Sequence, residues 1–245
     1  SELKFKQAAK ISSKYLTNKK LSFGETIFYS SKKCRISLNS NYNLGIIILC
    51  APLIRVCLSN SKNFKANLEK LLNSISPNDG SYILKSIAFV KPAGIKNYTG
   101  KGNIFDKNKI LSFSEIMHIG AKWDRISRCY VENYREIFDF GLPLFSSLKK
   151  KISRKKAIEI LYINYLSKSL DSNILRKFGS EKASIVMKGG IKVRKKMNIY
   201  RKNHKILENF DFYLKKLHFN PGTCADLTVT TLLMDKIRDI FRVPL

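Results

Sequence analysis

The stretch Asn43-Leu44-Gly45-Ile46-Ile47-Ile48-Leu49-Cys50-Ala51-Pro52-Leu53-Ile54-Arg55-Val56-Cys57 is apolar on nearly every side. A helix with this pattern is enclosed by other helices or lies in a membrane. Its uninterrupted apolar run, from Leu44 to Ile54, is shorter than the roughly 20 residues that span a bilayer, and Arg55 ends it. The stretch therefore predicts the central helix of a helical bundle and no membrane span.

Elsewhere, apolar residues recur in steps of three and four, as on the buried face of a helix. The candidate helical segments are residues 3–16, 63–75, 80–90, 111–138, 158–166, 173–187, 204–217 and 227–241. Gly189-Gly190 is interpreted as a break, and no sustained alternation of period two predicts a large sheet. We expect an all-α protein, a single multi-helix bundle domain over residues 1–245 with a polar pocket between helices.

The chain carries 46 Lys and Arg residues against 18 Asp and Glu residues, a formal net charge of +28. Such self-repulsion favours anionic partners, which include nucleic acid, anionic lipid and polyphosphorylated small molecules. The richness in Lys, Asn, Ile and Ser also fits an AT-biased genome, in which part of the charge is mutational drift. The basic runs at residues 149–156 and 188–205 fit either a solvated face or a nucleic-acid patch.

The cysteines form no Cys-x-x-Cys pair and are odd in number: Cys34, Cys50, Cys57, Cys129 and Cys224. This argues against a disulfide framework and a zinc ribbon, and it favours a reducing compartment. The three histidines have no metal-ligand spacing, and the first residues lack the apolar core of a signal peptide. We expect a cytoplasmic protein.

The stretch from His218 to Thr228 contains Asn220-Pro221-Gly222-Thr223-Cys224-Ala225-Asp226, a polar turn that runs into an apolar helix. Its amides would lie unpaired at a helix N-terminus, where the helix dipole favours anions. A phosphate or a metal–phosphate ligand fits such a place. The alternative is a plain helix start, because Thr223 and Asp226 have the spacing of a capping box.

Two more polar groups interrupt apolar helical segments in the first half of the chain. Asn39, Asn41 and Asn43 precede the central helix, where asparagines serve as N-caps or bind a base edge, a ribose hydroxyl or a phosphate. Asp124 lies beside an apolar stripe and stands four residues before Arg128. An i,i+4 ion pair explains this spacing, and a catalytic carboxylate is the alternative.

The last polar group is Asp171-Ser172-Asn173-Ile174-Leu175-Arg176-Lys177-Phe178-Gly179. One interpretation is an Asp171 N-cap followed by two solvated cations. The other places Asp171 on a metal or a hydroxyl and the cations on phosphates.

These groups resemble four blocks of the triphosphoribosyl-dephospho-CoA synthase family, in the family's order. The residues that carry the resemblance are Asn41-Tyr42-Asn43-Leu44-Gly45 with Ala51-Pro52-Leu53, Ala121-Lys122-Trp123-Asp124-Arg125-Ile126-Ser127 with Tyr130, Asp171 through Gly179, and Asn220 through Thr228. The family's usual opening Lys-Pro-Gly-Asn element is absent from this sequence, and its Gly-Gly-Leu-Gly loop is reduced to Ala93-Gly94-Ile95. These departures indicate an N-terminally short or divergent member.

The resemblance implies a pentosyl transferase that moves the 5-triphosphoribosyl group of ATP to the ribose 2′-hydroxyl of 3′-dephospho-CoA or a related acceptor and releases adenine. The product is the precursor of the prosthetic group of an acyl carrier protein. Such a transfer passes through an oxocarbenium-like state that carboxylates stabilise, and the triphosphate needs Mg²⁺. A basic helical module that binds nucleic acid and a catalytically inactive relative are the alternatives.

The resemblance also implies roles for individual residues. We expect catalytic roles for Asp124, Asp171 and Asp226, with Asp171 and Asp226 as the metal ligands and Asp124 at the acceptor hydroxyl or the metal. Substrate-binding residues are Asn41, Asn43 and Asn220 at the ribose or the base, Arg176 and Lys177 at phosphates, and Gly222 and Thr223 at the helix start.

Overall fold

The computed structural model describes residues 2–59, 63–106, 111–200 and 204–241. These residues form α-helices, one 3₁₀ turn and one π-helical segment, and none of them lies in a β-strand, which confirms the all-α prediction. No helix within these ranges is long and apolar enough to cross a membrane. The chain divides into two compact units, Ser1–Tyr134 with Lys236–Leu245, and Arg135–Asp235. The prediction of one domain over residues 1–245 stays a prediction.

The first unit contains seven helices of the described chain and the end of an eighth. They are α1 (Glu2–Leu16), α2 (Phe23–Leu38), α3 (Leu44–Leu58), α4 (Phe64–Asn73), α5 (Pro77–Val90), the 3₁₀ turn η1 (Ile95–Asn97), α6 (Phe113–Gly120) and α7 (Arg125–Val131), with the last residues of α12 (Gly222–Phe241). Helix α3 packs against α1, α2, α4, α5 and α7. Most of its residues are buried, including Ile47 and Leu53, which confirms the prediction of a central helix.

Pro52 interrupts the hydrogen bonding of α3, because proline has no N–H to donate to the carbonyl of Ile48. The hydroxyl of Tyr130, on α7, donates to that carbonyl at 2.8 Å, and the hydroxyl of Tyr134 donates to the carbonyl of Leu49 at 2.8 Å. Burial raises the pKa of both phenols, so they remain protonated donors. The turn of α3 before Pro52 is thereby bonded to Tyr130 at the end of α7 and to Tyr134 just after it.

Helix α2 is absent from the sequence prediction, although it packs against α1, α3 and α5. Its buried face mixes apolar residues, such as Phe23 and Ile27, with the polar residues Thr26, Ser30 and Ser31, so the apolar stripe is interrupted in the sequence. Small side chains let neighbouring helices approach closely. Ser22 caps its N-terminus in a capping box with Glu25.

The segment predicted as one apolar stripe, residues 111–138, is divided into three pieces. Helix α6 ends at Gly120, α7 begins after Asp124, and a π-helix, η2 (Glu136–Gly141), starts after two residues with positive φ, Asn133 and Tyr134. The left-handed pair turns the chain at the end of α7, where Tyr134 meets α3. The period of the pattern was therefore right and the continuity of the helix was wrong.

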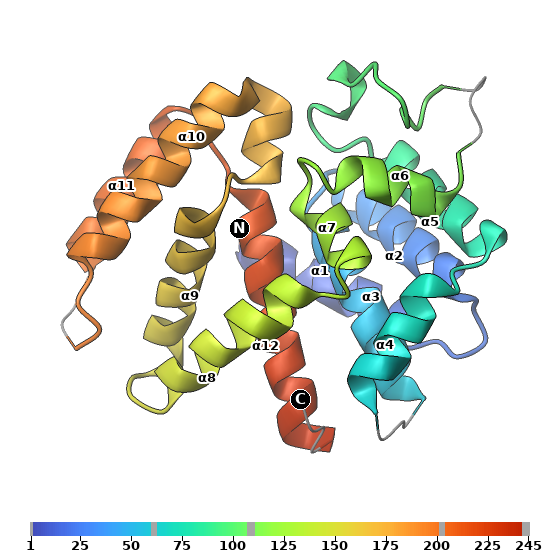
Figure 1. Cartoon of the computed structure of the whole chain (residues 1–245), viewed down its shortest axis with the longest axis horizontal. Helices are drawn as coiled ribbons and strands as arrows, with labels where there is room; N and C mark the ends of the chain where they lie inside the picture. The colour runs from blue at the N-terminus through green and yellow to red at the C-terminus, as the bar shows by residue number, and fades with distance from the viewer. Residues whose placement is uncertain (1, 60–62, 107–110, 201–203, 242–245) are drawn as a thin grey trace. The chain divides into compact units, whose positions relative to one another are not determined.

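The second unit contains η2, α8 (Leu142–Lys149), α9 (Arg154–Lys168), α10 (Ser172–Lys196), α11 (His204–Lys216) and α12 as far as Asp235. Helix α9 packs against α8 and α10, and α10 and α11 lie side by side (Figure 1). Gly189 and Gly190 lie inside α10, so their interpretation as a break was wrong. A Cβ on Gly189 would lie 2.8 Å from the Phe210 ring and one on Gly190 3.2 Å from Leu166, so both glycines permit close helix packing.

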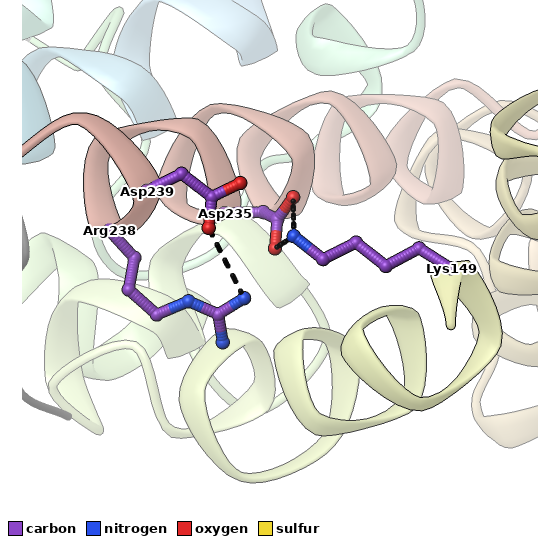
Figure 2. Close-up of polar contacts among 4 residues, drawn as sticks. All are labelled: Lys149, Asp235, Arg238 and Asp239. Atoms are coloured by element: carbon purple, nitrogen blue, oxygen red, sulfur yellow. Dashed lines mark hydrogen bonds and ion pairs between the residues drawn. The ribbon is translucent and has the colours of Figure 1, made fainter.

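Lys149 is the first residue of a basic run predicted to be a solvated face or a nucleic-acid patch. Its ammonium instead lies 2.8 and 2.9 Å from the two carboxylate oxygens of Asp235 on α12 (Figure 2). The Asp235 side chain is fully buried, and that of Lys149 is 26% exposed. This ion pair joins α8 to α12 inside the second unit.

Tyr130→Phe should lower the free energy of unfolding by about 1–3 kcal/mol, because the carbonyl of Ile48 loses its donor in a buried place. In a Pro52→Ala background, the new backbone N–H of residue 52 can take that carbonyl, and the cost of Tyr130→Phe should fall. Urea unfolding of the four proteins of this cycle measures the difference. Tyr213→Phe, on a 41% exposed tyrosine, is the control. Equal costs in the two backgrounds would contradict the explanation.

Lys149→Met should destabilise the protein by about 3–5 kcal/mol, because it removes the ammonium from a buried carboxylate. Lys150→Met changes the exposed neighbouring lysine in the same way and should leave the unfolding midpoint close to that of the wild type. Thermal unfolding of both variants at neutral pH makes the comparison. If the two variants unfold at the same temperature, the ion pair of Lys149 and Asp235 does not stabilise the protein.

Candidate active site

In the second unit, the side chain of Asp171 joins two helix N-termini. Asp171 is the N-cap of α10, where its Oδ1 accepts hydrogen bonds from the amides of Asn173 and Ile174 at 2.9 and 3.1 Å. Its Oδ2 accepts from the amide of Cys224, the third residue of α12, at 2.8 Å. Its residue surface is only 1% exposed. The carboxylate thus satisfies amides of two helices that start 50 residues apart in the sequence.

A second contact joins the same two chain segments. The side-chain amide of Asn173 donates to the carbonyl of Asn220 at 2.9 Å, and its Oδ1 accepts from Arg176 at 3.2 Å. Gly222 lies against Asn173, since a Cβ there would be 3.2 Å from the Asn173 amide nitrogen. Thr223, the next residue, is 3% exposed. The structure therefore brings Asp171, Arg176, Asn220 and the start of α12 together at one corner.

Helix α10 is kinked at Gly179, whose φ of 83° and ψ of 175° are not helical. Such a φ favours glycine. The residues just before the kink are cationic and aromatic: Lys177 is exposed, and its ammonium lies 5.1 Å from the centroid of the Phe178 ring. Arg176 is half-buried. The two predicted phosphate ligands thus occupy the surface of the first, short section of α10.

Asp226 is half-buried in the first turns of α12. Its carbonyl accepts from the hydroxyl of Thr230 at 2.8 Å, a contact within the helix. Among the described residues, no group of three or more His, Cys, Asp and Glu side chains is arranged to hold a metal ion. A magnesium ion held through one or two carboxylates and the phosphates of a substrate does not need such a group.

The bonds of Asp171 bear on its predicted role as a metal ligand. A carboxylate has about four acceptor positions, and backbone amides occupy at least three of those of Asp171. This geometry favours an anchoring role over coordination. The neighbouring Tyr162 phenol has its pKa raised by burial, and the charges of Cys224 and Asp171 act in the same direction.

In the first unit, Asp124 is the N-cap of α7. Its Oδ2 accepts from the backbone amide and the hydroxyl of Ser127, both at 2.9 Å. Its Oδ1 is buried and has no hydrogen-bond partner among the residues that the structure describes. Arg128 donates to the carbonyl of Ala121 at 3.1 Å, so the i,i+4 interpretation of Asp124 and Arg128 does not explain the acid. A buried carboxylate oxygen without a donor is costly, which marks Asp124 as a position where a ligand would supply the missing partner.

The asparagines before α3 divide their roles. Asn41 is exposed, and its Oδ1 accepts from the amide of Leu44 at 3.2 Å, as a cap does. Asn43 is 6% exposed, and its side-chain amide lies 3.6 Å from the sulfur of Cys34. Asn39 ends α2 in the left-handed conformation. Asn43 occupies the N-cap position of α3 but makes no side-chain cap bond, and Asn39 is a C-cap. The N-cap interpretation therefore fits the contact of Asn41 alone, and the substrate roles of Asn41 and Asn43 stay predictions.

The predicted site residues fall in both compact units. Asn41, Asn43 and Asp124 belong to the first, whereas Asp171, Arg176, Lys177, Asn220, Gly222, Thr223 and Asp226 belong to the second. The prediction that they line one polar pocket stays a prediction. Sequence analysis assigned no role to Asn173 and Ser127, which make the contacts to Asn220 and Asp124. Their positions inside the two quoted blocks were the available signal.

Comparison with known proteins gives a family and a fold. The family model described as ATP:dephospho-CoA triphosphoribosyl transferase matches residues 3–244. A crystal structure described as "putative triphosphoribosyl-dephospho-coA synthase from Archaeoglobus fulgidus" is similar with a TM-score of 0.74 and 21% sequence identity, over 95% of this chain and 97% of that chain. At this identity the likeness supports the fold alone. No curated protein sequence matches the chain.

Asp171→Asn should lower the free energy of unfolding by about 1–3 kcal/mol, because an amide keeps one acceptor oxygen and cannot serve both helix N-termini. Asp211→Asn provides a control, since Asp211 is exposed and pairs with Lys215 along its own helix. Hydrogen exchange should show faster opening at the amides of Asn173, Ile174 or Cys224 in the first variant. Unchanged stability and exchange would contradict the anchoring role.

Proposed function

The chain belongs to the ATP:dephospho-CoA triphosphoribosyl transferase family, and we propose that it transfers the 5-triphosphoribosyl group of ATP to the ribose 2′-hydroxyl of 3′-dephospho-CoA with release of adenine. The observation that carries the proposal is the family match over residues 3–244, which includes every predicted site residue. The family establishes a transferase that uses ATP. The acceptor hydroxyl and the leaving group are the proposed parts.

The reaction exchanges two bonds at C1′ of the ATP ribose. The bond from C1′ to the adenine nitrogen breaks, and adenine leaves with the bonding electron pair. The acceptor 2′-oxygen forms the new bond to C1′ and gives up its proton. Positive charge develops on the sugar between these events, so nearby carboxylates lower the barrier.

We assign Asp124 as the base that accepts the proton of the acceptor hydroxyl. Its Oδ1 is buried and finds no donor within the described part of the chain, so a substrate hydroxyl would satisfy it. Ser127 holds the other oxygen through two hydrogen bonds and thereby orients the carboxylate. Asp226, which is half-buried in the first turns of α12, is assigned to the developing positive charge or to the metal.

The triphosphate is assigned to the corner formed by the starts of α10 and α12. Lys177 and Arg176 supply positive charge, and the N-terminus of α12 adds its dipole. Asn220 would contact the ribose or the base, and the start of α12 at Gly222 and Thr223 would contact the phosphates. Asn41 and Asn43, in the first unit, are assigned to a ribose or a base. Asp171 keeps the two helix starts together through the amides that it accepts.

Magnesium, when bound, neutralises charge on the triphosphate. Asp226 fits as a protein ligand, because a single carboxylate with substrate phosphates is a common arrangement for this ion. Asp171 fits less well, because backbone amides occupy most of its acceptor positions. We also propose that the protein is cytoplasmic and that its product goes to an acyl carrier protein as a prosthetic-group precursor.

The test is adenine release from ATP and dephospho-CoA, followed by chromatography, with and without Mg²⁺. Asp124→Asn should lower kcat by about 100-fold or more, because an amide cannot accept the proton. Asp226→Asn should lower activity and raise the Mg²⁺ concentration required. Asp139→Asn, an exposed acid in an i,i+4 pair with Arg135, is the matched control and should leave the rate unchanged.

Wild-type protein that releases no adenine under these conditions would refute the proposed reaction. A normal rate in Asp124→Asn would remove Asp124 as the base. A rate of adenine release that does not depend on Mg²⁺ would contradict the proposed role of magnesium.

A further inference from the structure

An exposed aromatic pair lies beside the predicted phosphate-binding residues of the second unit. The rings of Phe178 and Phe219 meet edge to face, with centroids 5.1 Å apart and planes at 69°. Phe178 is 37% exposed, and Phe219 is half-buried. An aromatic ring this accessible offers apolar surface that folding alone leaves in contact with water.

The position of Phe178 is set by the kink of α10. Gly179 follows it with a φ of 83°, which ends the first helical section of α10 immediately after the ring. A Cβ placed on Gly179 would meet no atom within 4 Å, so the space beside this turn is open. The kink therefore ends the first section of α10 directly after Phe178, at a turn with open space beside Gly179.

Both aromatic residues are sequence neighbours of residues at this corner. Phe219 precedes Asn220, whose carbonyl accepts from Asn173, and Phe178 follows Arg176 and Lys177. The ammonium of Lys177 lies 5.1 Å from the centroid of the Phe178 ring. The ring thus has one cation beside it, and Arg176, which bonds Asn173 at the same corner, supplies a second, an arrangement that suits a planar base carrying phosphates.

We propose that Phe178, supported edge to face by Phe219, stacks on the adenine ring of an adenine nucleotide whose phosphates contact Arg176 and Lys177. This inference rests on the proposed function, because it assigns a base-binding position to the same corner. Both proposed substrates contain adenine, so the shared chemistry is an adenine nucleoside with attached phosphates. The source is ATP or dephospho-CoA, and the experiment separates them.

A packing role for the pair would give a different result. In that case Phe178 and Phe219 only fasten the kink of α10 to the segment before α12, and the base is bound elsewhere. A leucine at position 178 keeps apolar contact with Phe219 and removes the flat ring face. Phe178→Leu should then have no effect specific to the base.

The experiment compares ligands with and without the base, by calorimetry on the full chain. The pairs are ATP against tripolyphosphate and dephospho-CoA against 4′-phosphopantetheine. Phe178→Leu should weaken the binding of one adenine-containing ligand by roughly tenfold, the size expected for the loss of one stacked base, and leave its base-free counterpart within twofold. Phe178→Trp keeps a flat ring and should bind the same ligand more tightly than Phe178→Leu does. Phe212→Leu, on a 68% exposed phenylalanine of α11, is the matched control.

The ligand that loses affinity identifies the source of the adenine. Equal losses for a ligand and its base-free counterpart, or no loss for any of the four, would overturn the stacking role. Phe178→Met takes the place of Phe178→Leu if the leucine variant does not fold. Binding is measured without turnover, so wild-type protein that binds these ligands and releases no adenine would refute the reaction and leave the stacking test readable.

Discussion

The bond from the Tyr130 hydroxyl to the carbonyl of Ile48 is the contact on which the first unit depends most directly. Pro52 leaves this carbonyl without its helical donor in the most buried helix of the unit. An unsatisfied carbonyl there would be costly, and a side chain from outside α3 supplies the donor. Because Tyr130 lies on the helix that Asp124 caps, the same contact holds the candidate base against the helix that the asparagines precede.

The second unit uses a carboxylate for a comparable purpose. Asp171 accepts amides from the starts of α10 and α12, which brings two distant blocks of the sequence into contact. The first unit contains a similar tie, in which Asp79 of α5 accepts from the hydroxyl of Ser22 and the amide of Gly24 at the start of α2. Acids of this protein therefore do structural work at helix ends. An acid in a family motif is not by that fact a catalytic group, and the buried oxygen of Asp124 that lacks a donor is the exception that points to chemistry.

Sequence analysis identified helices with a continuous apolar stripe, and α3, which is apolar on nearly every side. It missed α2, whose buried face mixes Phe23, Ile27 and Cys34 with Thr26, Ser30 and Ser31. Gly189 and Gly190 were interpreted as a break, although they lie inside α10 and allow it to pack closely against Phe210 and Leu166. Lys149 was interpreted as part of a solvated face or a nucleic-acid patch, because its partner Asp235 lies 86 residues further along the sequence. In each case the residue's environment comes from another helix, which a local pattern does not contain.

The sequence by itself determined that the chain is helical and that α3 is central, because apolar periodicity depends on neighbouring positions. It also identified the four blocks whose resemblance to a family implies a transferase, because such motifs are local. Only the tertiary structure decided which polar groups are already satisfied. In the folded chain, Asp171 accepts hydrogen bonds from backbone amides, and the side-chain amide of Asn43 contacts the sulfur of Cys34. One oxygen of Asp124 has no donor among the described residues. Hydrogen-bond satisfaction depends on atoms brought from distant parts of the chain, so it exists only once the helices have packed.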